Sequence, residues 1–201
     1  MTKLEQLAHE TPPILMRDPL AEFLGLRGKE IPISYSLEDA GRYAGHLCPT
    51  VATAFEMTRE ALHQLYGAEL PVRGNIRVTM ASAPDQFANG PMARVIGFIT
   101  GAARDDGFRG LAGRWSRQNL LLFAPEQRPF GSVLFERLDN GASVRLVALA
   151  ERAGTAGEDV GPLLRSALEN TQEPLPRFQQ AWMDRVVSVL TAGPGMFQRV
   201  D

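Results

Sequence analysis

The clearest hydrophobic pattern in the chain is that of an amphipathic helix over residues 49–67. Apolar side chains recur there at helical spacing, at Val51, Phe55, Leu62, Leu65 and Tyr66. Pro49 suits the first turn of this helix, and Gly67 suits its end. The compact apolar segment 92–100 predicts a second helix, which Gly101 closes. Two more helices are expected near the C-terminus, over residues 159–170 and 175–190.

Two shorter helices are predicted by their start signals. Asp18 followed by Pro19 places an N-cap residue before a proline at the first helical position, and Gly28 is a suitable end. Ser36 and Asp39 resemble a capping box, which predicts a short helix running toward Ala44.

Strand-like segments gather in the middle of the chain, at residues 31–35, 76–80, 119–124, 132–138 and 143–150. The sequence Asp139-Asn140-Gly141 is a strong hairpin signal and predicts that the last two of these strands pair antiparallel. Helices early and late with strands between them indicate an α+β fold with an antiparallel-containing central sheet. We expect one domain, with an N-terminal arm at residues 1–35, a core at 36–150 and a helical C-terminal segment at 151–201.

Composition narrows the classes of function. A net charge of −2 argues against nucleic-acid binding, which needs a basic face. No apolar run approaches the length of a membrane-spanning helix, so no membrane association is expected. The N-terminus lacks the apolar core of a signal peptide, which predicts a cytoplasmic protein, and the single cysteine fits a reducing compartment.

The candidate functional residues are a histidine and the single cysteine in the sequence Gly45-His46-Leu47-Cys48-Pro49, at the start of the long helix. A helix N-terminus stabilises a thiolate there, which makes Cys48 a better nucleophile or metal ligand. His46 lies two residues earlier, in a turn that Gly45 permits. An imidazole and a thiolate on one turn suit zinc or another borderline metal. Either residue alone is more often structural, a small buried hydrophobe or a packed histidine; the two together favour a functional site.

This motif resembles the Gly-His-x-Cys-Pro-Gly signature of the FmdE-like proteins, a family named after a component of formylmethanofuran dehydrogenase. The order of elements is also similar over about residues 36 to 200: the strand at 76–80, the turn at 82–86, Thr100-Gly101 and the late strand pair. The resemblance implies an α+β core, a homodimer and a transition metal, most commonly zinc. The cysteine-rich C-terminal zinc finger of some members has no counterpart in this sequence.

Two positions depart from the family pattern. Thr50 replaces the glycine after Cys-Pro, and Ser82 stands where the family supplies a further cysteine ligand from a Cys-x-x-Asp turn. The resemblance therefore carries over His46 and Cys48 as metal ligands and leaves the third ligand open. Asp85 is an oxygen donor in that turn and is our candidate for the third ligand, with a turn-capping aspartate as the alternative.

A glycine-rich loop at residues 102–117 carries Arg104, Arg109 and Arg114. Forked guanidinium donors and close backbone approach would suit an anionic ligand, so these three arginines are candidate anion contacts. A solvated loop, partly neutralised by Asp105 and Asp106, is the alternative that we favour.

The motifs of common enzyme classes are missing: the sequence has no Gly-x-Ser-x-Gly, His-Glu-x-x-His or Cys-x-x-Cys. The leading hypothesis is a cytoplasmic homodimer that binds zinc or another transition metal and, with an open coordination position, a small molecule. The sequence leaves open whether the protein is an enzyme. One rival is a haem-binding or other cofactor-binding protein that uses His46 or Cys48. The other is a non-catalytic module in which Cys48 only packs or senses redox state.

Overall fold

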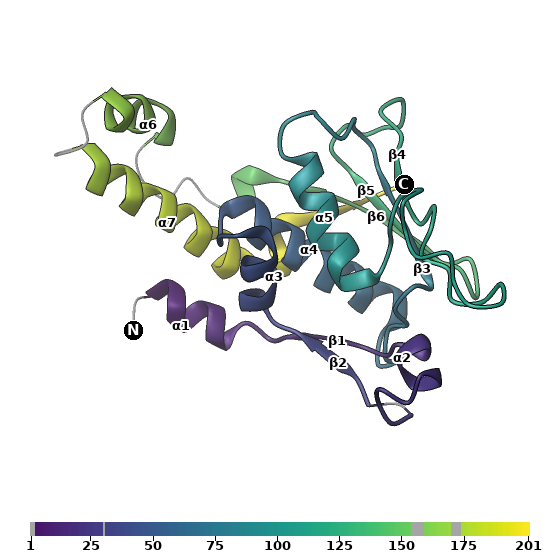
Figure 1. Cartoon of the computed structure of the whole chain (residues 1–201). Coiled ribbons are helices and arrows are strands. Elements are labelled where there is room, and N and C mark those ends of the chain that lie inside the picture. The colour runs from purple at the N-terminus through teal and green to yellow at the C-terminus, as the bar shows by residue number, and fades with distance from the viewer. Residues whose placement is uncertain (1–2, 30, 154–158, 170–173) are drawn as a thin grey trace.

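A mixed five-stranded sheet and the helices packed on it form the centre of the molecule (Figure 1). The computed structural model describes residues 3–29, 31–153, 159–169 and 174–201. Its helices are α1 (Lys3–Glu10), α2 (Pro19–Phe23), α3 (Leu37–Ala44), α4 (Pro49–Tyr66), α5 (Asn89–Thr100), α6 (Val160–Glu169) and α7 (Pro174–Ala192). Its strands are β1 (Ile14–Met16), β2 (Ile33–Tyr35), β3 (Ile76–Met80), β4 (Leu121–Phe123), β5 (Val133–Arg137), β6 (Ser143–Ala148) and β7 (Phe197–Val200).

The large sheet has the strand order β4-β3-β5-β6-β7. Strands β3 and β4 run parallel, and every other neighbouring pair is antiparallel. The prediction of an α+β fold with an antiparallel-containing sheet is therefore confirmed. The predicted hairpin between β5 and β6 also forms, with Phe135 opposite Val144.

The core lies between the sheet and helices α4 and α5. Helix α4 packs against β6 and α5 packs against β3. Alternate residues of the central strands, among them Val78 and Phe135, are completely buried on the helical side. The apolar stripe predicted for residues 49–67 faces this core, since Val51, Phe55 and Leu62 are all buried.

The local start and stop signals act as expected. Ser36 caps α3 in a full capping box with Asp39, and Gly101 ends α5 in the left-handed conformation. Several predicted ends differ by a few residues. Helix α2 stops at Phe23, and α5 begins at Asn89 rather than at Met92. Strand β6 stops at Ala148 before a short 3₁₀ turn, and β4 begins only at Leu121. Asn119 has a positive φ of 57°, which no strand residue adopts, and this explains the late start of β4.

The N-terminal segment, predicted as an arm, packs on the rest of the chain. Strands β1 and β2 form a separate antiparallel ribbon, and Ile14 and Met16 of β1 are buried. The backbone N–H of Arg17 donates to Pro71, and that of Arg73 donates to Arg17, so the ribbon is tied to the chain before β3. Helix α1 packs against α7.

The C-terminal helices α6 and α7 pack on each other, and α7 also contacts α4. In Figure 1, α6 lies beside the start of α7, away from the sheet. The predicted helix over residues 159–170 is present as α6, and Asn170, its predicted end, lies outside the described residues. The chain then returns to the sheet as β7, which pairs with β6. The sequence did not predict this last strand.

Candidate functional site

The turn between α3 and α4 carries the two predicted metal ligands. Gly45 ends α3 with a φ of 86°, a left-handed conformation that glycine adopts without strain. Cys48 is the N-cap residue of α4, and Pro49 occupies the first turn. The sequence-based placement of Cys48 at the mouth of the helix is thus confirmed. Its thiol is free of any disulfide and makes no capping hydrogen bond.

Both predicted ligands line one cavity of about 840 Å³. Cys48 is buried with 7% of its surface exposed, whereas His46 is exposed. The remaining walls come from α3, the turn after β3, helix α5 and, on α7, Trp182. Arg94 of α5 brings a positive charge to this cavity. The sequence analysis identified His46 and Cys48 as candidate site residues, but it did not identify Arg94 or Trp182.

The turn after β3 holds the candidate third ligand. Asp85 is exposed and is not among the residues that line the cavity with His46 and Cys48. Ser82 is buried, and its hydroxyl has no hydrogen-bond partner. Across the described ranges, no three His, Cys, Asp or Glu side chains gather as a metal-binding group. The assignment of Asp85 as a ligand therefore stays a prediction from the sequence.

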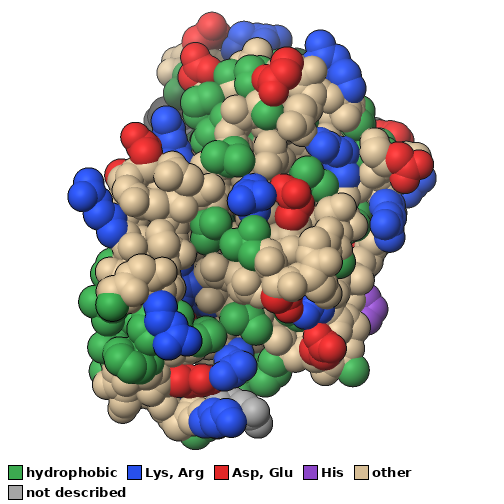
Figure 2. Space-filling view, turned by 90° about the vertical axis from the view of Figure 1, so that its right-hand side faces the viewer, with side chains coloured by type: hydrophobic (Ala, Val, Ile, Leu, Met, Phe, Trp, Pro, Cys, Tyr) green, Lys and Arg blue, Asp and Glu red, His purple; other side chains and the backbone are tan. Residues whose placement is uncertain are grey.

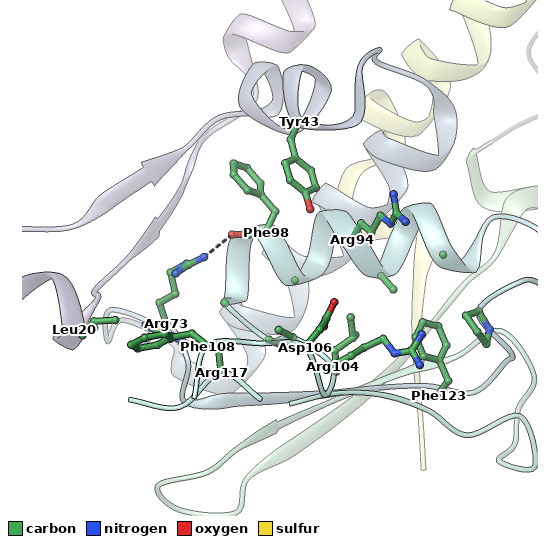
Figure 3. A pocket seen from close by; sticks show the side chains of 18 residues that line it. Leu20, Tyr43, Arg73, Arg94, Phe98, Arg104, Asp106, Phe108, Arg117 and Phe123 are labelled. Atoms are coloured by element: carbon green, nitrogen blue, oxygen red, sulfur yellow. Dashed lines mark hydrogen bonds between the residues drawn. The ribbon is translucent and has the colours of Figure 1, made fainter. Parts of the chain in front are cut away.

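A second cavity, of about 850 Å³, lies along α5 (Figure 3). In the figure, Tyr43 of α3 lies on one side of α5, and Arg104, Asp106 and Phe123 lie on the other. Four residues line both cavities: Tyr43, Pro84, Gly90 and Arg94. The two cavities are therefore neighbours that share the N-terminal half of α5 as a wall.

Asp18, Arg73 and Arg117 form a buried charge cluster at the second cavity, where both arginines are lining residues. Nη2 of Arg117 donates to one carboxylate oxygen of Asp18 at 2.9 Å, and Nη1 of Arg73 donates to the other at 3.3 Å. Asp18 also accepts from the first backbone N–H groups of α2. Burial lowers the pKa of Arg117, and the Asp18 carboxylate opposes that shift. One carboxylate thus joins two guanidinium groups that are 99 and 55 residues away in sequence.

The three arginines predicted as anion contacts occupy different surroundings. Arg104 lines the second cavity, and its guanidinium lies 5.8 Å from the ring centre of Phe123. Arg109 and Arg114 are exposed and line neither cavity, and Arg114 lies over the ring of Trp115. Among the three, Arg104 alone lines either of these two cavities.

Surface charge is mixed on the face in Figure 2, where acidic and basic side chains are interspersed and no continuous basic patch forms. Among the described residues, no helix combines the length and the hydropathy needed to cross a bilayer.

Comparison with known proteins returns nothing that names a family. No protein-family model matches this chain, and no curated protein matches it. The similarity to the FmdE-like family thus rests on the motif around His46 and Cys48 and on the order of elements.

Proposed function

We propose that this protein is a cytoplasmic homodimer that binds a transition metal, zinc first of all, through His46 and Cys48. The observation that carries the proposal is that both side chains line one cavity from a single turn. Membership of the FmdE-like family is part of the same proposal. It is supported by the Gly45 to Pro49 motif and by the α+β layout.

The two residues suit a borderline metal. Imidazole nitrogen and thiolate sulfur are the usual zinc donors in proteins. Zinc takes four ligands, so His46 and Cys48 fill about half of its shell. Water, a bound small molecule or a residue of the other protomer would supply the rest. Such a bound metal would act as a Lewis acid toward a small molecule in the cavity.

The protein's own side chains would define that small molecule. Trp182 and Val95 give the cavity apolar walls, which exclude water, and Arg94 offers a forked donor for an anionic or carbonyl oxygen. Tyr43 lies where this cavity meets its neighbour. The combination favours a binding or catalytic role for the cavity over a purely structural role for Cys48.

The test is metal content measured on purified protein together with its absorption spectrum. We expect stoichiometric zinc in the wild type, and loss of most of it in His46→Ala and in Cys48→Ser with the fold retained, because a core of this size does not depend on one ion. His63→Ala is the matched control, since His63 is an exposed histidine of α4 that lines neither cavity. Unchanged metal in both site variants would refute the assignment. A Soret band in the wild type that is lost in the same variants would show that the bound group is haem rather than zinc. A wild type without stoichiometric metal would favour the non-catalytic module.

The homodimer makes a separate prediction. Light scattering at micromolar concentration is expected to give about twice the chain mass of 22.0 kDa. A mass near 22.0 kDa at that concentration would count against the dimer and against a ligand supplied by the other protomer.

A further inference from the structure

The second cavity concentrates positive charge. Four arginines line it, Arg73, Arg94, Arg104 and Arg117, and Asp106 is the one acidic residue among its described lining residues. They come from the chain before β3, from α5 and from the loop at 102–117, so the fold itself brings them together. A cavity with walls of one charge sign attracts ligands of the opposite sign.

Two of these arginines have guanidinium N–H groups that are available to a ligand. No described residue forms a hydrogen bond or an ion pair with Arg94, whose side chain is exposed. Arg104 approaches Asp105 only at 4.0 Å, and both side chains are more than half exposed, so this pair is weak. Each guanidinium therefore keeps its fork free for an oxyanion, which it binds in a bidentate way.

The other two arginines add charge to the cavity wall. Arg73 and Arg117 share the single carboxylate of Asp18, so one positive charge is not balanced there. Nε of Arg73 and Nη1 of Arg117 are buried without a hydrogen-bond partner. Proteins seldom leave buried donors unpaired, and clustered positive charge attracts anions.

The walls between the arginines are aromatic. Tyr43 stacks on Phe98 with ring centres 4.6 Å apart and planes inclined by 11°. Phe108 and Phe123 line the opposite side with Arg104. Flat apolar surfaces of this kind fit a planar group rather than a free inorganic ion.

We propose that this second cavity is a binding site for a small anion that carries a carboxylate or phosphate on a planar apolar body. Arg94 and Arg104 bind the oxyanion, and Tyr43 and Phe98 contact the planar part. Because Tyr43 and Arg94 line both cavities, the ligand extends toward His46 and Cys48. The proposal does not depend on a bound metal.

Ligand-observed NMR titration tests the site with phenyl phosphate, benzoate and neutral benzyl alcohol. The protein is wild type with EDTA present, and the same titration is repeated on Cys48→Ser. We expect the anions to bind at least about tenfold more tightly than the alcohol in both proteins. The tighter anion identifies the group, phosphate or carboxylate, that the natural ligand carries. Because metal is absent throughout, failure of the metal site leaves this result unaffected.

The variants Arg94→Gln and Arg104→Gln should each weaken anion binding about tenfold, the effect of one charge-assisted hydrogen bond. Arg109→Gln is the matched control, because Arg109 carries the same charge, lies in the same loop as Arg104 and lines neither cavity. Circular dichroism checks that every variant is folded. Equal binding of anions and alcohol, an equal loss in Arg109→Gln, or no binding of any probe would each overturn the proposal.

Discussion

Replacing Asp18 by alanine is expected to lower the free energy of unfolding by about 3–5 kcal/mol, the cost of breaking a buried ion pair from one side. Only 7% of Asp18 is exposed, and Arg117, its nearer partner, is equally inaccessible. Alanine would leave two guanidinium groups without their shared carboxylate, and buried charges without partners are strongly destabilising. The same change removes the N-cap of α2, which adds about 1 kcal/mol.

Urea denaturation followed by circular dichroism measures this loss of unfolding free energy. Two further variants serve as comparisons. Asp18→Asn keeps a side-chain oxygen for the backbone N–H groups of Leu20 and Ala21, so its loss should be smaller. Glu38→Ala removes an ion pair with Arg42 in which both side chains are about two-thirds exposed, and should cost less than about 1 kcal/mol. If Asp18→Ala were no less stable than Glu38→Ala, the buried cluster would not hold the N-terminal segment to the core.

The features that the sequence predicted best are those fixed by local chemistry. The capping box at Ser36, the glycine that ends α5 and the turn at Asp139-Asn140-Gly141 each act within a few residues of themselves. The long helix α4 was predictable because its apolar spacing continues over five turns. Such signals need no knowledge of the rest of the fold.

Strands β1 and β7 were not predicted from the sequence. β1 has three residues and β7 has four, too few to display an alternating pattern. Both exist because of a distant partner: β7 adds to the edge of the sheet beside β6, almost 50 residues earlier in the chain. The parallel pairing of β3 with β4 is also nonlocal, and no turn signal marks it.

The candidate site likewise combines residues that the sequence could predict with residues that it could not. His46 and Cys48 lie within three residues, so their common location followed from the turn alone. The partnership of Asp18 with Arg117 spans 99 residues, and Trp182 reaches the cavity from α7. Side chains brought together by tertiary packing leave no short-range pattern in one sequence. Within the loop at 102–117, composition could not separate Arg104 from its exposed neighbours, because only the folded loop decides which side chain meets the cavity.

The register of the central strand gives the second large expected effect. Phe135 lies opposite Val78 of β3 and Val144 of β6, and none of its surface is exposed. Its neighbour Leu134 points to the other face of the sheet, because successive strand residues alternate, and it is only partly buried. Phe135→Ala should therefore lower the free energy of unfolding by about 3–5 kcal/mol through lost burial and the cavity left behind.

Leu134→Ala is the matched control, one residue away in the same strand, and its cost should be nearer about 1 kcal/mol because less apolar surface is lost. Thermal and urea unfolding of both variants measure the two values side by side. The ratio of the two losses tests which face of the sheet carries Phe135. If the register of β5 were shifted by one residue, Leu134 would face the core in place of Phe135, and Leu134→Ala would be the more destabilising variant. A Leu134 variant less stable than the Phe135 variant would show that helices α4 and α5 do not cover the face that carries Phe135. A cost for Leu134→Ala that grows with protein concentration would instead indicate that a second copy of the chain binds the face that carries Leu134, because the stability of an oligomer depends on concentration.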